Sequence, residues 1–147
     1  RGLNEVCGLN VVEAADGQPV RAGHVLLAPA GLHLSLVRQK DGEVVTHLNM
    51  QPLDTAHRPA VDVLFQSAAD LFGARTLAVV MTGMGSDGLA GAKEIVAAGG
   101  HVIAQDEETS VVWGMPGQVT NAGLCSAVLP LPEIGGRISR LFTGERP

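Results

Sequence analysis

The chain has 147 residues, 46% of them hydrophobic and 17% charged, which is enough apolar sequence to bury the core of one domain. Its formal net charge of −5, without any run of like charge, argues against nucleic acid or an anionic membrane surface as a partner. No apolar stretch approaches the roughly 18 residues of a membrane span and no signal peptide opens the chain, so we expect a soluble cytoplasmic protein without membrane insertion.

The first third of the chain has the pattern of short β-strands separated by turns. Alternating or β-branched residues predict strands at Leu9–Ala14, His24–Ala28 and Leu34–Arg38. Asp41-Gly42 is a turn signal, and the alternation of apolar and polar residues continues beyond it from Val44 to Leu48. These two alternating segments predict an antiparallel hairpin.

From Pro59 onward, helical and strand patterns alternate, which is typical of a parallel sheet covered by helices. The predicted elements are a helix from Pro59 to Phe72, a strand Leu77–Met81, a helix Leu89–Ala98, a strand His101–Gln105, a helix Ser110–Asn121 bent near Pro116, a strand Ala127–Leu131 and a helix Glu133–Phe142. We therefore predict an α/β fold with a doubly wound, mainly parallel (Rossmann-like) sheet and an accessory antiparallel hairpin.

The segment Gly-Met-Gly-Ser-Asp-Gly at residues 83–88 lies between a predicted strand and a predicted helix. It places one carboxylate, Asp87, at the carboxyl end of a strand, where catalytic groups of α/β enzymes collect. Aspartate is also a preferred N-cap residue, so Asp87 could cap a helix that begins at Gly88 or Leu89. The two roles are compatible, because one carboxylate oxygen can cap a helix while the other holds an imidazole.

The same segment has the G-x-G-x-x-G spacing of a dinucleotide-binding loop, formed here by Gly83, Gly85 and Gly88. Asp106 follows Gly88 by 18 residues, close to the position of a ribose-binding carboxylate. Against this alternative, Asp87 inside the loop would repel a pyrophosphate. From spacing and charge alone, both interpretations stay open.

The whole chain, over about residues 1–140, resembles the chemotaxis receptor methylesterases of the CheB type, which are protein-glutamate methylesterases and glutaminases. The resemblance rests on five blocks in order: VVEAADG at 11–17, GHVLLAPAGLHL at 23–34, HRPAVDVLF at 57–65, TGMGSDGLAG at 82–91 and IAQDEETSVVWGMP at 103–116. The last two blocks are the most specific.

This resemblance implies hydrolysis of γ-glutamyl methyl esters, and deamidation of glutamines, on methyl-accepting chemotaxis receptors by a Ser-His-Asp triad. Asp87 falls at the position of the triad aspartate, and the residues around it are implied to line the site: Gly83, Met84, Gly85 and Gly88. No metal or organic cofactor is implied, and Cys7 and Cys125 lack metal-ligand spacing. Family members commonly carry a receiver domain as well.

The resemblance also indicates what the chain lacks. In the family, the nucleophilic serine and the histidine belong to segments that would precede Arg1, so residues 1–147 are expected to be a partial catalytic domain without its first strands and helix, inactive alone. Ser86 has no nearby histidine in sequence and is not expected to replace the nucleophile. His57 and Arg58 are candidates for binding an acidic receptor segment, whereas His33 is expected to be structural. A non-catalytic receptor-binding module remains an alternative.

Overall fold

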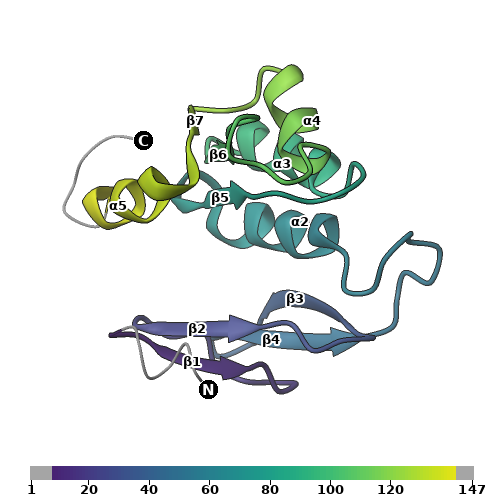
Figure 1. The fold of residues 1–147 in the computed structure, drawn as a ribbon. Helices are drawn as coiled ribbons and strands as arrows, with labels where there is room; N and C mark the ends of the chain where they lie inside the picture. Colours follow the sequence, from purple (N-terminus) through teal and green to yellow (C-terminus); the bar gives the residue numbers. More distant parts are fainter. Residues whose placement is uncertain (1–7, 142–147) are drawn as a thin grey trace.

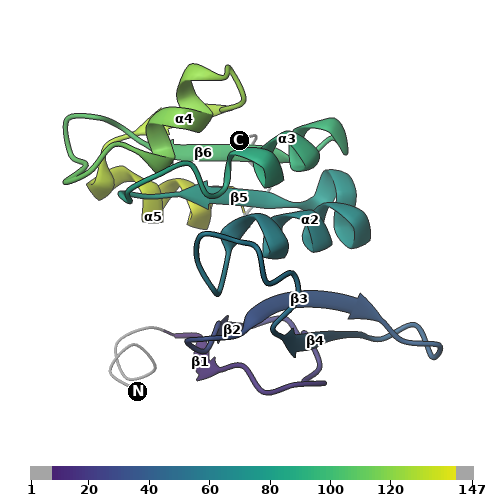
Figure 2. The ribbon, with the colours of Figure 1, turned by 90° about the vertical axis from the view of Figure 1, so that its right-hand side faces the viewer.

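The chain folds into two layers that lie one above the other (Figure 1). The computed structural model describes residues 8–141. Short strands form the lower layer, and a parallel sheet with its helices forms the upper layer. Figure 2, turned by 90°, shows the same separation, with helix α2 facing the strands of the lower layer.

The lower layer contains two short sheets. Strands β1 (Asn10–Glu13) and β2 (His24–Leu27) pair in parallel, and β3 (His33–Arg38) and β4 (Val44–Asn49) form an antiparallel pair. The tight turn between β3 and β4 contains Gly42 with a φ of +88°, a left-handed conformation that glycine adopts readily. The predicted accessory hairpin is therefore confirmed.

The upper layer is built on a parallel sheet with the strand order β5-β6-β7, formed by Leu77–Val80, His101–Gln105 and Ala127–Leu129. Residues 102–104 of the central strand β6 are fully buried, as expected for a parallel strand covered on both faces. One core cluster joins the sheet to α2 (Val61–Phe72), α3 (Leu89–Ala97) and α4 (Met115–Asn121), and a second joins it to α5 (Leu131–Leu141). The doubly wound α/β fold is confirmed.

Three predicted helix starts are wrong: α2 and α4 begin later than predicted, and α5 begins at Leu131 rather than Glu133. The predicted bent helix over 110–121 is a loop followed by a shorter helix, because α4 begins only at Met115. Pro116 lies in its first turn, where a missing N–H removes no helical hydrogen bond, so no bend is needed. Helix α2 begins at Val61 rather than Pro59, after an extended Ala60. The last helix ends at Leu141, and the predicted Phe142 lies outside the described residues.

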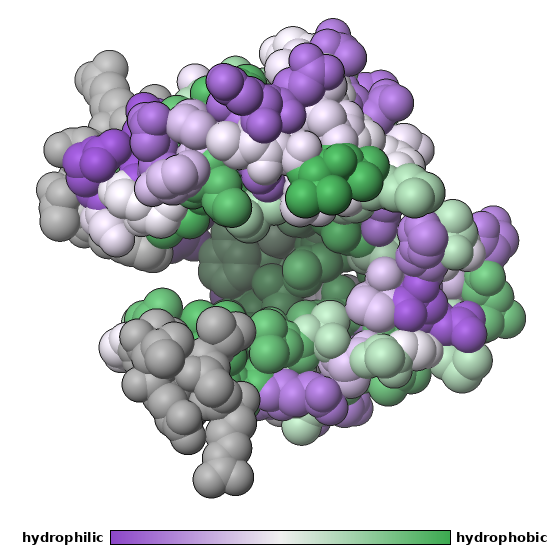
Figure 3. Space-filling view, viewed as in Figure 1, coloured by the Kyte–Doolittle hydropathy of each residue, from purple (hydrophilic) through white to green (hydrophobic). Residues whose placement is uncertain are grey.

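The outer strands of the parallel sheet, β5 and β7, each have one unpaired edge within residues 8–141. Within residues 8–141, β5 pairs only with β6, so no described strand lies beside β5 on its other side. Figure 3 shows a hollow between the two layers that is lined with hydrophobic residues. An unpaired strand edge beside an apolar hollow is a surface on which further strands could pack.

Candidate functional site

The Asp87 loop (residues 83–88) follows β5 at the carboxyl edge of the parallel sheet. At its start, Gly83 O accepts a hydrogen bond from the backbone N–H of Met115 at 2.8 Å, which joins the loop to the beginning of α4. Gly85 and Gly88 have φ values of +91° and +97°. These left-handed turns, which favour glycine, direct the chain sharply from the strand into α3.

Asp87 caps a helix, but not the helix that the sequence indicated. Its two carboxylate oxygens accept hydrogen bonds from the backbone N–H groups of Val61 (2.7 Å) and Asp62 (2.9 Å), the first residues of α2. The predicted cap on α3 is wrong, because Gly88 precedes that helix without a side-chain cap. The cause lies in α2, whose N-cap residue Ala60 has no side-chain acceptor.

Asp62 makes the reciprocal contact. Its Oδ1 accepts hydrogen bonds from the backbone N–H groups of Gly88 (3.0 Å) and Gly91 (2.7 Å) at the start of α3. Asp87 therefore binds the N-terminus of α2, which contains Asp62, and Asp62 binds the N-terminus of α3, which follows Asp87. The sequence prediction missed Asp62; the only available signal was an acidic residue in the first turn of a helix.

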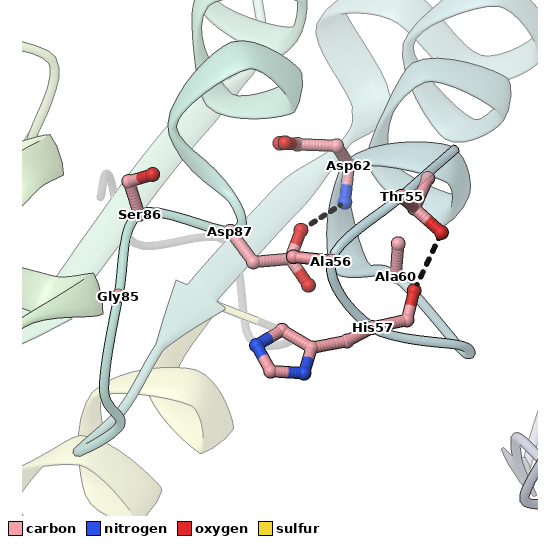
Figure 4. A pocket seen from close by; sticks show the side chains of 8 residues that line it. All are labelled: Thr55, Ala56, His57, Ala60, Asp62, Gly85, Ser86 and Asp87. Carbon is pink, nitrogen blue, oxygen red and sulfur yellow. Dashed lines mark hydrogen bonds between the residues drawn. The ribbon is translucent and has the colours of Figure 1, made fainter.

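A cavity of about 330 Å³ opens beside the Asp87 carboxylate (Figure 4). One wall comes from the Asp87 loop, and the other comes from the His57 loop (residues 50–60), which connects β4 to α2. The lining residues are Thr55, Ala56, His57, Ala60, Asp62, Gly85, Ser86 and Asp87. The fold thus brings together two segments that lie about thirty residues apart in the sequence.

The two candidate substrate-binding residues lie differently. His57 lines the cavity with an exposed side chain, while its backbone oxygen accepts a hydrogen bond from Thr55 Oγ1 at 2.8 Å. Arg58 is directed to the lower layer, where its Nε donates to Gly31 O at 2.9 Å and its own backbone oxygen accepts from Gly31 N–H at 3.2 Å. Only His57 is placed at the mouth of the cavity.

His33 anchors the His57 loop from behind. Its side chain is fully buried, Ala60 N–H donates to its Nδ1 at 3.1 Å, and its Nε2 lies 2.9 Å from Pro52 O. Since Nδ1 is an acceptor and Pro52 O can only accept, the proton is on Nε2 and the ring is neutral. The expected structural role of His33 is borne out by these contacts.

The remaining predicted site residues are not equivalent. Gly85 lines the cavity, whereas Met84 projects into solvent and is 77% exposed. Gly88 is buried under Val61. Ser86 also lines the cavity, but within the described residues no histidine is hydrogen-bonded to its hydroxyl. A serine without a base is a weak nucleophile.

The geometry does not favour the dinucleotide alternative. The N–H groups of Gly88 and Gly91, which a pyrophosphate would require at the start of α3, already bind the Asp62 carboxylate. Asp106, the candidate ribose ligand, accepts hydrogen bonds from the N–H (2.9 Å) and hydroxyl (2.6 Å) of Thr109. A bound phosphate would also face Asp87, so its negative charge would meet two carboxylates.

Two further properties concern only the part of the chain that the structure describes. No group of three or more His, Cys, Asp or Glu side chains there is arranged to hold a metal ion. No helix between residues 8 and 141 combines the length and hydropathy needed to cross a membrane.

The fold and the cavity define an α/β domain with a fixed carboxylate at the carboxyl edge of a parallel sheet, a usual place for catalytic groups. The family model for the CheB methylesterase domain matches residues 1–138, so this chain belongs to the CheB methylesterase family. Its fold matches the crystal structure of the Thermotoga maritima CheB methylesterase catalytic domain with a TM-score of 0.90 and 41% identity, covering 95% of this chain and 74% of that one.

Curated relatives carry a consistent description. A protein-glutamate methylesterase/protein-glutamine glutaminase of Bradyrhizobium diazoefficiens is 54% identical over 134 residues, and one of Rhodopseudomonas palustris is 56% identical over 134 residues. Both alignments cover 91% of this chain and 34% of the relative. The chain therefore spans about a third of the length of these relatives.

Proposed function

We propose that this chain forms most of the catalytic domain of a protein-glutamate methylesterase that also acts as a protein-glutamine glutaminase. The substrates would be γ-glutamyl methyl esters and certain glutamines of methyl-accepting chemotaxis receptors. The observation that carries this proposal is the Asp87 carboxylate at the wall of an open cavity, in a chain of the CheB methylesterase family. The relatives described by these two activities support the reaction class.

In this proposal, Asp87 is the triad carboxylate that orients a histidine. A carboxylate in that role accepts the Nδ1 proton, fixes the tautomer and stabilises the imidazolium that forms when the serine attacks. Each Asp87 oxygen already accepts one backbone N–H, and a carboxylate has about four acceptor sites, so capacity for an imidazole remains. The two backbone anchors hold the carboxylate in position before the histidine arrives.

The reaction would proceed by acyl transfer. The serine hydroxyl attacks the ester carbonyl while the histidine takes its proton, and methanol leaves after the histidine returns that proton. Water then hydrolyses the acyl-enzyme, which releases the glutamate side chain. A glutamine substrate would follow the same course, with ammonia as the leaving group.

We further propose that the serine and histidine lie on strands and a helix that precede Arg1. The uncovered edge of β5 and the apolar hollow between the layers are where such strands could pack (Figure 3). The Thermotoga maritima catalytic domain extends beyond the aligned region, since this chain covers 74% of it. The much longer relatives leave room for a receiver domain as well.

The wall opposite Asp87 is the proposed contact for the receptor. His57 lies exposed at the mouth, and Arg58 follows it in the same loop. Cationic or polar groups at this position suit the acidic residues around receptor methylation sites. His57 would contact the substrate, while the Arg58 side chain holds the loop to Gly31.

Methanol release from a methylated receptor tests the proposal. The comparison uses this chain and the protein extended through the preceding strands, each with and without Asp87→Ala. We expect release only from the extended protein, and about a ten-thousandfold loss on substitution. Asp70→Ala, on the exposed side of α2, is the control for loss of an acidic side chain. A folded extended protein that releases no methanol would favour the receptor-binding module instead.

A further inference from the structure

Asp62 contacts both the Asp87 side chain and the backbone directly after it. Its backbone N–H donates to Asp87 Oδ1 at 2.9 Å, and its own carboxylate accepts from Gly88 N–H at 3.0 Å. Gly88 is the residue directly after Asp87, so these contacts hold both the side chain of Asp87 and the backbone that carries it. The third contact, from Gly91 N–H at 2.7 Å, ties the same Asp62 oxygen to the first turn of α3.

The packing of α2 against α3 leaves little room for this arrangement to shift. A Cβ on Gly91 would lie 2.5 Å from Phe65 Cβ and 3.2 Å from Asp62 Oδ1, which is too close without movement. Gly91 is buried against α2, and the absence of its side chain lets the Asp62 carboxylate reach the α3 backbone. The half-buried Asp62 side chain is therefore packed closely against the start of α3 on one side, while it lines the cavity on the other.

The charges also agree with the exchange of caps. The first turn of a helix carries a partial positive charge, and an acidic side chain there is stabilised. Asp87 occupies the N-terminus of α2 and Asp62 that of α3. Backbone N–H groups thus fix the orientation of each carboxylate. Because Asp62 also binds the backbone next to Asp87, the orientation of Asp87 depends on the contacts of Asp62.

We propose that Asp62 is a positioning residue that holds Asp87 in the orientation needed to align the catalytic histidine. This inference rests on the proposed function, because Asp62 acts only through Asp87. Asp62 itself takes no part in the reaction. Loss of the Asp62 carboxylate removes the acceptor for Gly88 and Gly91 and lets the Asp87 loop relax. A displacement of the order of 1 Å at a catalytic group can lower turnover about a hundredfold.

The test compares Asp62→Ala, Asp62→Asn, Asp70→Ala and Asp87→Ala in the full-length methylesterase, with kcat and KM for methanol release from a methylated receptor. We expect Asp62→Ala to lower kcat about 10- to 100-fold with KM changed less than about twofold. Asp62→Asn retains an amide oxygen for the same two N–H groups and should stay within about threefold of the wild type. Asp70→Ala, on the same helix but exposed, should leave both constants unchanged.

A second readout is independent of activity. Amide hydrogen exchange at Gly88 and Gly91 should accelerate in Asp62→Ala and not in Asp62→Asn, because only the first loses the acceptor. If Asp62→Ala does not fold, Asp62→Ser takes its place, with the same direction of change in kcat and exchange expected.

The outcomes separate the two proposals. Asp62→Ala with wild-type kcat, alongside an inactive Asp87→Ala, would overturn the role of Asp62 and leave the triad proposal intact. Loss of activity in Asp62→Asn as large as in Asp62→Ala would also overturn it, because the hydrogen-bond acceptor would then not be the cause. Full activity in Asp87→Ala would instead refute the proposed function.

Discussion

The two walls of the cavity are held in different ways. On one wall, the Asp87 side chain itself is fixed, because both of its oxygens bind backbone N–H groups of α2. On the other wall, the backbone of the His57 loop is anchored by the buried His33, but the His57 ring is exposed and makes no hydrogen bond within the described residues. The molecule thus fixes the carboxylate in advance, whereas on the opposite wall it holds the backbone and leaves the His57 ring unbonded within the described residues.

The largest expected effect tests the fixed wall. Asp87→Asn replaces one carboxylate oxygen by an amide group that cannot accept from Val61 or Asp62. In the extended protein we expect methanol release to fall about ten-thousandfold, equivalent to about 5 kcal/mol in the activation barrier. Thermal unfolding should show a smaller loss of about 1–2 kcal/mol from the weakened cap on α2. An active variant that has lost the same stability would confine Asp87 to a structural role.

A smaller effect is expected for His33, which anchors the backbone of the His57 loop. His33→Ala leaves the N–H of the buried Ala60 without its acceptor and releases the loop at Pro52. We expect the free energy of unfolding to fall by about 2–3 kcal/mol, measured by urea denaturation. In the extended protein, KM should rise more than kcat falls, because the wall that moves carries His57 and not Asp87.

The control for that experiment is His24→Ala. His24 is exposed at the start of β2 and contacts only the nearby Ala22 O among the contacts described. Its removal should change stability by less than about 0.5 kcal/mol. An equal loss of stability in both variants would mean that His33 does not anchor the loop.

Helix packing behind the fixed wall gives a third measurement. Gly91→Ala introduces a Cβ that would lie 2.5 Å from Phe65 Cβ. We expect a net loss of about 1–2 kcal/mol in thermal unfolding, because overpacking outweighs the gain in helix propensity. Gly135→Ala in α5 is the matched control, since nothing lies within 4 Å of its Cβ position, and it should be neutral or stabilising. Stabilisation by both substitutions would show that α2 and α3 can separate easily.

The smallest effect concerns Cys125, a half-buried thiol that packs against the core of the upper layer. Burial raises the pKa of the Cys125 thiol above its ordinary value of 9.0, and the hydrogen bond with Thr120 acts more weakly in the opposite direction. The folded chain favours the neutral thiol. Its contribution to stability is therefore present below pH 9 and is lost as the pH rises through the raised pKa.

Alkylation of Cys125 tests this burial, in a Cys7→Ser background that leaves one thiol. Between pH 8 and 9 the reaction should be slower than that of a small thiol, because less thiolate is present. Thr120→Val should slow it further, and unfolding in urea should restore the ordinary rate. Rapid alkylation of the folded chain would show that the half-buried Cys125 thiol is not desolvated by the core it packs against.

Much of the fold was predictable because its signals are local. Strand β6 has the predicted bounds His101–Gln105 around the apolar residues 102–104, and the hairpin follows from alternation on both sides of Asp41-Gly42. The start of α4 was predicted five residues too early, although Val111, Val112 and Gly114 all have low helix propensity and residues 110–114 do not join the helix. They form a loop instead, in which Gly83 pairs with Trp113 across the sheet edge.

For the site, the sequence by itself determined the family, the α/β class and the position of Asp87 at the end of a strand, since these depend on residue order and local periodicity. The tertiary structure decided which N–H groups Asp87 binds, because the cap on α2 comes from a residue 26 positions later. It also decided that Asp62 belongs to the same hydrogen-bonded unit and that His57 faces the cavity. Such contacts depend on how α2 packs against α3, and local sequence patterns do not determine that packing.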